Sequence, residues 1–273
     1  MRLARRLRVL EKGLTMNSRS TFWPAVEMDG EPWVRLDNGA RFAKWTHDDE
    51  VNHNQRLRQA QKYQFFVNAF DHLKQNRIPG DYYEFGCHRV RTFRMALTEA
   101  RHQNLDQMRF LAFDSFKGLP PTTSDPTLEL WHQPGVLATS VEEFRRLVNE
   151  HGVYADKIET FPGYYDASLT PELQKKLVAR KSTIALVNID CDLYESAVPV
   201  FDFIEPLLQE GSLIYLDDIL VGYKASPMKG VARAWLEFQA RSRFKYMRHM
   251  DIGWWGRCYI AYVPDPAVPQ GVI

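Results

Sequence analysis

Two apolar runs of strand length are each followed at once by a pair of aspartates: Asp190 and Asp192 after residues 184–189, and Asp217 and Asp218 after residues 212–216. Four carboxylates gathered in one place repel one another unless a proton or a hard cation intervenes. Little basic charge lies near them in the sequence. We therefore predict a divalent-metal site.

The segment between the two runs explains how the acids come together. Residues 194–208 repeat apolar side chains at helical spacing. A strand, a helix and a second strand form a right-handed crossover, which places both strand ends on one edge of a parallel sheet. Open α/β sheets bind ligands at that edge.

Two earlier stretches could hold a nucleoside. Glu84 and Gly86 end one predicted strand, and glycine lets a ligand approach the backbone ahead of the next helix. Asp114 ends the following strand, where a carboxylate can accept both hydroxyls of a ribose. The motif G-x-G-x-x-G is absent after Gly86, which disfavours a pyrophosphate cofactor and a nicotinamide oxidoreductase. S-adenosylmethionine (SAM) has no phosphate and needs less glycine.

Five motifs in register resemble the TylF/MycF type of sugar O-methyltransferase, a family of class I SAM-dependent enzymes assisted by Mg²⁺. The resemblance covers about residues 80–240 and rests on the segments 84–86, 114–120, 161–169, 189–196 and 216–218. It implies metal ligation by Asp190, Asp217 and Asp218. It also implies a SAM site, which we assign to Glu84, Gly86, Cys87, Asp114, Ser115, Gly163 and Tyr164.

The chain departs from the family pattern twice. The glycine pair usual beyond Glu-x-Gly is replaced by Arg89, Val90 and Arg91, which could tighten or block the SAM loop. Asp-Gly-Asp is replaced by Asp190-Cys191-Asp192, which requires a negative φ at Cys191.

The resemblance implies an O-methyltransferase that moves a methyl group from SAM to a hydroxyl of a sugar in a glycoside, antibiotic or polysaccharide. Mg²⁺ or another hard divalent cation would activate the hydroxyl. We assign catalytic roles to Asp190 and Asp192, the latter as general base or outer acceptor. The alternative is a methyltransferase-like binding or scaffold protein that has lost SAM binding.

Strand and helix patterns alternate and end in a hairpin, which predicts a doubly wound, mostly parallel α/β sheet of seven strands, the Rossmann-like fold of class I methyltransferases. The predicted strands are 81–85, 108–113, 157–161, 184–189, 212–216, 244–250 and 257–263. The predicted helices are 56–77, 91–102, 141–151, 171–179, 194–208 and 228–241.

Residues 1–55 are expected to form a basic amphipathic helix and an aromatic-rich segment that either caps the sheet edge or forms a peripheral packing layer. Residues 56–273 are expected to form the methyltransferase domain. The helix over 1–20 is expected to pack on its own domain or a partner, with membrane-surface attachment or organelle targeting as alternatives. A net charge of +1 predicts no nucleic-acid partner. Three scattered cysteines and no apolar run of membrane-spanning length predict a cytoplasmic protein without an integral membrane segment. The family resemblance implies a homo-oligomer.

Overall fold

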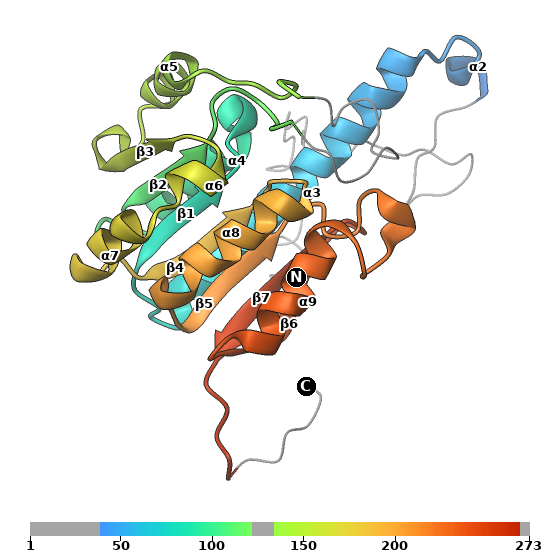
Figure 1. Cartoon of the computed structure of the whole chain (residues 1–273). Coiled ribbons are helices and arrows are strands. Elements are labelled where there is room, and N and C mark those ends of the chain that lie inside the picture. The colour runs from blue at the N-terminus through green and yellow to red at the C-terminus, as the bar shows by residue number, and fades with distance from the viewer. Residues whose placement is uncertain (1–38, 122–133, 268–273) are drawn as a thin grey trace, which may run out of the picture. The chain divides into compact units, whose positions relative to one another are not determined.

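The computed structural model describes residues 39–121 and 134–267 (Figure 1). The chain divides into two units, residues 1–60 and 61–273, and the boundary falls inside helix α3 (His47–Gln75). The basic helix predicted over residues 1–20 lies outside the described residues. The predicted cap role of residues 21–55 and the domain boundary after residue 55 stay predictions.

The described part of the first unit consists of α2 (Gly39–Phe42) and the start of α3. The predicted start of this helix at residue 56 is wrong, because α3 begins at His47. Thr46 and Asp49 form a reciprocal cap: the Thr46 hydroxyl accepts from the Asp49 N–H at 3.2 Å, and the Asp49 carboxylate accepts from the Thr46 N–H at 3.0 Å. Among residues 47–55 Val51 is the single apolar side chain, so these turns carry no apolar period that would reveal a helix.

The second unit is built on one seven-stranded sheet, as predicted. The strands are β1 (Asp81–Phe85), β2 (Phe110–Asp114), β3 (Ile158–Pro162), β4 (Ile184–Ile189), β5 (Leu208–Leu216), β6 (Lys245–Ile252) and β7 (Gly256–Tyr262). Their order is β3-β2-β1-β4-β5-β7-β6. The first five strands are parallel, whereas β7 is antiparallel to β5 and to β6. The predicted doubly wound sheet with a C-terminal hairpin is confirmed.

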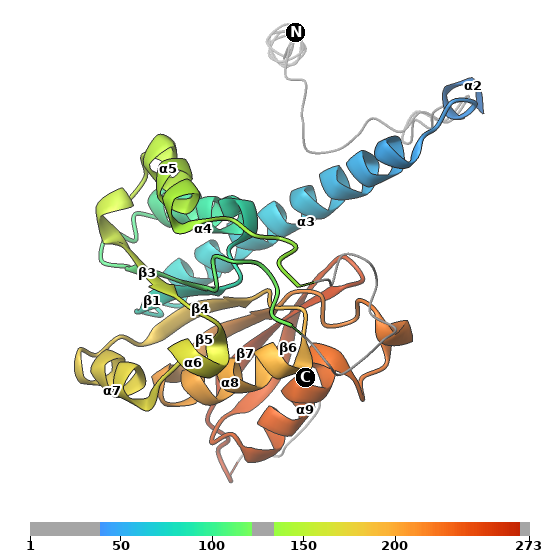
Figure 2. The ribbon, with the colours of Figure 1, turned by 45° about the horizontal axis from the view of Figure 1, so that its top comes forward.

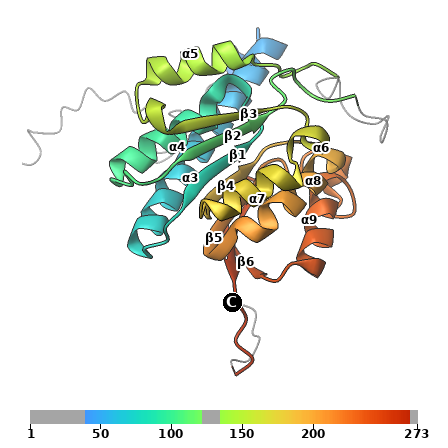
Figure 3. The same cartoon turned by 60° about the vertical axis from the view of Figure 1, so that its left-hand side comes forward.

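Helices cover both faces of this sheet (Figures 2 and 3). One face carries α6 (Tyr165–Ser168), α7 (Pro171–Ala179), α8 (Tyr194–Ile204) and α9 (Gly230–Arg241). The other carries α4 (Arg91–His102), α5 (Val141–His151) and the part of α3 that belongs to this unit. Each face therefore has its own apolar core.

Two element ends differ from the sequence prediction around the first crossover. Helix α8 stops at Ile204 and a 3₁₀ turn, Glu205–Leu207, follows it, because Pro206 cannot donate to a continued helix. Strand β5 starts at Leu208, four residues before the predicted start at Ser212. Gly211, with φ +88°, bends this early part of the strand.

The hairpin turn is tighter than the six residues predicted, because Ile252 and Gly256 still pair across β6 and β7. No helix among residues 39–121 and 134–267 combines the length and apolar character needed to span a membrane.

Gly86, directly after β1, lies against the backbone of Asp190, directly after β4. A β-carbon on Gly86 would lie 1.8 Å from the backbone oxygen of Asp190, and Gly86 has φ +93°. Glycine is thus required here by the protein's own backbone, and not only by a ligand as the sequence suggested.

We predict that Gly86→Ala lowers the free energy of unfolding by about 3 kcal/mol or more, because it adds a steric clash to an unfavourable φ. Gly222→Ala is the matched control. Gly222 has φ +72°, but a methyl group added there would meet nothing within 4 Å, so the expected loss is about 1–2 kcal/mol. Urea unfolding measures both. Equal losses in the two variants would contradict the role assigned to the Asp190 contact.

Candidate active site

One sheet edge carries most of the predicted site residues in spatial order. Directly after each of four strands, a backbone N–H group donates to the neighbouring strand and so extends the parallel hydrogen-bond pattern. Gly163 donates to Asp114 O at 2.9 Å, Gly86 to Phe113 O at 3.0 Å, Asp190 to Phe85 O at 2.8 Å and Asp217 to Ile189 O at 2.9 Å. The ends of β3, β2, β1, β4 and β5 therefore lie side by side, with the aspartate pairs adjacent.

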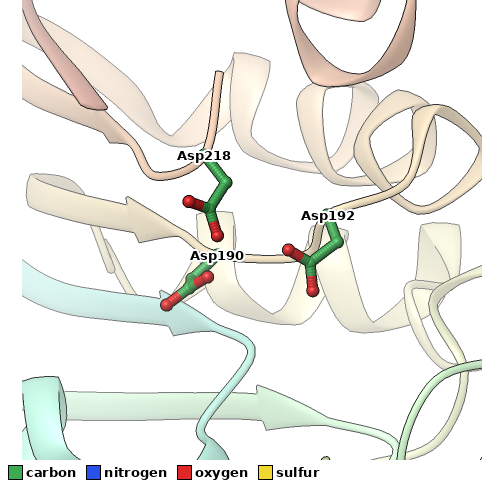
Figure 4. A group of neighbouring side chains, drawn as sticks. All are labelled: Asp190, Asp192 and Asp218. Atoms are coloured by element: carbon green, nitrogen blue, oxygen red, sulfur yellow. The ribbon is translucent and has the colours of Figure 1, made fainter. Parts of the chain in front are cut away.

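Three carboxylates converge after β4 and β5. Asp190, Asp192 and Asp218 each offer an oxygen, and these oxygens lie within 4.8 Å of one another (Figure 4). All three side chains are half-buried. Hard oxygen donors at this spacing suit Mg²⁺ or a similar cation, so these residues fit a metal of the predicted kind. The sequence predicted Asp217, and not Asp192, as the third ligand.

Two of these aspartates have strained backbones. Asp192 has φ 58° and Asp218 has φ 51°, in the left-handed region that non-glycine residues rarely adopt. Such strain costs about 1–3 kcal/mol per residue and gathers at functional sites. The left-handed residue of the Asp190-Cys191-Asp192 turn is thus Asp192 and not Cys191, which meets the condition set by the sequence.

A cation that the sequence did not predict lies at this edge. Lys62, on α3, places its ammonium 3.4 Å from Asp190 Oδ2 and in direct contact with Asp217 Oδ2. Little basic charge lies near the acids along the sequence, but the fold brings this ammonium to them. Lys62 is 128 and 155 residues from these partners, so proximity in sequence could not reveal it.

A signal for Lys62 was nevertheless present in the pattern of its helix. The buried residues of α3 are Phe65, Phe66, Ala69, Phe70 and Leu73. Lys62 lies three and four positions before Phe65 and Phe66, and hence on the face that packs against the sheet. A lysine on an apolar helix face indicates a buried acidic partner.

Two further donors to Asp217 come from the strand before it and from the hairpin. Its Oδ1 accepts from Tyr215 OH at 2.7 Å and from Trp255 Nε1 at 3.1 Å. Trp255 is buried, while its neighbour Trp254 in the same turn is 58% exposed. The Asp217 carboxylate thus meets donors on both oxygens, and its predicted role as a metal ligand stays a prediction.

The charges of the cluster shift its pKa values in opposite directions. Burial and the neighbouring charge of Asp217 raise the pKa of Asp190 well above its usual value. Burial, with Asp190 and Asp217 adding to it, raises the pKa of Asp192 to about 7. Burial also acts to raise the pKa of Asp217, but the Lys62 ammonium outweighs it, so that this pKa lies below its usual value. Burial would lower the pKa of Lys62, but the carboxylates raise it above the ordinary value.

The predicted cofactor residues meet at the neighbouring end of β2. Asp114 accepts from the backbone N–H groups of Cys87 and Phe116, each at 2.6 Å. Burial raises the pKa of Asp114, and those two N–H groups oppose the rise. The Ser115 hydroxyl donates to Gly118 O at 2.7 Å, which closes the turn after β2. Asp114 is thereby held next to the loop that follows Gly86.

The other predicted cofactor residues lie in or just after the two strands beside β2, which are β3 and β1. Gly163 follows β3, and Tyr164 is the N-cap residue just before α6. Glu84 instead lies inside β1 and is fully buried, where it accepts from the hydroxyls of Tyr82 and Thr92. Its predicted contact with SAM stays a prediction.

The loop that lacks the family's glycines keeps a left-handed backbone. Arg89 has φ 54° and Val90 has φ 56°. The Arg89 N–H donates to Thr139 Oγ1 at 2.9 Å, the Arg89 side chain is exposed, and Val90 is buried in the core. The chain therefore adopts at these positions a conformation that glycine favours, although a β-branched residue such as Val90 resists it.

A parallel sheet with this strand order, an antiparallel C-terminal hairpin and acids after β2, β4 and β5 defines a class I methyltransferase fold. The family model for macrocin-O-methyltransferase (TylF) matches residues 41–259, and the chain belongs to this family.

Two curated proteins of Streptomyces are similar to part of the chain. The 8-demethyl-8-(2,3-dimethoxy-alpha-L-rhamnosyl)-tetracenomycin-C 4'-O-methyltransferase of Streptomyces olivaceus is 26% identical over 149 residues, or 53% of this chain and 54% of that protein. The demethyldecarbamoylnovobiocin O-methyltransferase of Streptomyces niveus is 26% identical over 151 residues, or 54% and 55% of the two chains. The chain spans about half the length of the curated relatives it matches.

Solved structures share the fold. The O-methyltransferase NovP matches with a TM-score of 0.60 at 22% identity, covering 75% of this chain and 81% of that one. The calicheamicin methyltransferase CalS11 matches with a TM-score of 0.58 at 16% identity, covering 80% of each chain.

We predict a pH-dependent effect of Glu84 on stability. Burial raises its pKa to about 7 from a value of 4.5 for the unperturbed group, although hydrogen bonds from Tyr82 and Thr92 oppose the rise. The unfolded chain then loses this proton first as the pH increases. The free energy of unfolding of wild type, relative to Glu84→Gln, should therefore fall between about pH 4.5 and pH 7 and level off above.

Urea unfolding of both proteins across this pH range measures the difference. A difference that stays constant or grows with pH would contradict the buried, protonated state of Glu84.

Proposed function

We propose that this protein is a SAM-dependent O-methyltransferase that methylates a hydroxyl of a sugar in a glycoside, with the help of a divalent cation. The observation that carries the proposal is the shared edge. Asp114 ends β2, the converging carboxylates of Asp190, Asp192 and Asp218 follow β4 and β5, and only β1 lies between β2 and β4. Membership of the TylF family and the rhamnosyl group in the name of one relative support the substrate class.

The two halves of the edge have separate tasks in this proposal. Asp114 accepts hydrogen bonds from the ribose hydroxyls of SAM, and the loop after Gly86 borders the rest of the cofactor. Asp190 and Asp218 hold the cation, and the role of Asp217 as a third ligand is part of the same proposal. When bound, the cation would lower the pKa of a coordinated sugar hydroxyl and orient its oxygen.

Asp192 takes the proton in this mechanism. A pKa near 7 suits a general base at neutral pH. The hydroxyl proton moves to the Asp192 carboxylate while the sugar oxygen forms a bond to the SAM methyl carbon. The carbon–sulfur bond breaks, and its electron pair stays on sulfur as a neutral thioether. The cytoplasmic location and homo-oligomeric state expected from the sequence belong to the same proposal.

SAM binding tests the role proposed for Asp114 and the loop after Gly86. Calorimetric titration should show one SAM per chain, and Asp114→Asn should weaken the Kd at least about tenfold, because it removes a charged acceptor for two hydroxyls. Asp156→Asn, an exposed change remote from the edge, is the control. If wild type releases no heat with millimolar SAM, the binding or scaffold alternative replaces the enzyme.

Metal dependence tests the role proposed for the aspartates that follow β4 and β5. With tritiated SAM and a panel of rhamnosyl glycosides, chelation should abolish methyl transfer, and added Mg²⁺ should restore it. Asp218→Asn should lower kcat at least about a hundredfold, since one ligand of the activating cation is lost. Its SAM Kd should stay within about threefold. Asp202→Asn on the exposed face of α8 should match wild type.

Full turnover after complete chelation would contradict the role of the metal, whereas the proposed SAM site would be unaffected.

A further inference from the structure

Lys62 lies where the aspartate cluster needs positive charge. Its side chain is only 12% exposed, and its ammonium contacts Asp217 directly while standing 3.4 Å from Asp190 Oδ2. These two carboxylates are themselves 1% and 25% exposed. The ammonium therefore bonds to two of the three predicted metal ligands inside the protein.

The helix beneath Lys62 holds it in this place. Phe65 and Phe66, one turn further along α3, are buried, and the Phe65 ring lies 4.5 Å from the ring of Tyr215. Tyr215 in turn donates to Asp217. The lysine and its acidic partner are thus fixed by the same packed cluster, and neither can move into solvent without disturbing it.

The cost of burying charge explains what the contact does. An unpaired buried ammonium or carboxylate is strongly unfavourable, and each becomes tolerable when the other is near. A divalent cation would satisfy the same carboxylates. Two cations that contact the same oxygens at the same edge repel each other and compete for the charge of those carboxylates.

We propose that Lys62 is a built-in counter-cation that competes with the metal for Asp217 and Asp190, so that it keeps the edge charge-balanced without metal and sets the metal affinity. Lys62 is a positioning residue in this scheme. The proposal rests on the metal site of the proposed function. It has two consequences: removal of the Lys62 charge tightens metal binding, and the variant becomes more dependent on metal for stability.

Mn²⁺ binding to the full-length chain, followed by electron paramagnetic resonance of the free ion, tests this inference. Lys62→Met should lower the Mn²⁺ Kd at least about tenfold, because a positive charge next to the cation is gone. The Mn²⁺-induced rise in Tm should also be larger than in wild type, since tighter binding to the folded state stabilises it more. Lost structure alone would weaken metal binding, so tightening separates the proposed role from a structural one.

Two further variants complete the design. Lys62→Gln keeps a hydrogen-bond donor for Asp217 without the charge, and should show the same tightening even if Lys62→Met fails to fold. Lys74→Met removes a lysine from an exposed position of the same helix, and should leave the Mn²⁺ Kd within about twofold of wild type.

Each outcome is decisive. If wild type binds Mn²⁺ and both Lys62 variants bind it equally or more weakly, the competition is refuted while the metal site stands. If neither wild type nor the Lys62 variants bind millimolar Mn²⁺, the metal part of the proposed function fails, and this inference fails with it. If only the Lys62 variants bind, the competition is supported in its strongest form.

Discussion

The charge balance at one sheet edge is the constraint on which the site depends. Four aspartates end two adjacent parallel strands, and their mutual repulsion would oppose folding without a cation. Lys62 supplies one from α3, a helix that precedes the whole sheet in sequence. The lysine reaches the acids because the phenylalanines of the same helix face pack on the sheet. The apolar core and the electrostatics of the site therefore depend on each other.

The edge also concentrates backbone strain. Gly86 admits the carbonyl of Asp190 at a distance that no side chain would allow, while Asp192 and Asp218 adopt left-handed conformations that favour glycine. Left-handed backbone recurs at Arg89 and Val90 in the loop after β1. Stability is thus lost at the positions where a ligand would be held, and the two buried cores on either side of the sheet offset that loss.

The departures from the family pattern concern side chains more than backbone. Replacing the usual glycines by Arg89 and Val90 leaves the loop in a glycine-like conformation, with one side chain exposed and the other in the core. Cys191 takes the middle of the aspartate turn because the left-handed residue is the next one. Both substitutions are compatible with the arrangement of acids that the sheet presents.

Local pattern was enough to predict the sheet, its C-terminal hairpin and the common edge of the aspartates, because strand and helix periods and the crossover rule act over short stretches. It failed at residues 47–55, where a polar helix depends on a cap rather than on an apolar period. It also failed for Lys62, whose partners are 128 and 155 residues away. The order of residues alone thus established which acids gather at the edge. Which cation faces them, and how Asp217 is held, became clear only in the folded chain, because helix packing and hairpin placement are long-range events that no local spacing encodes.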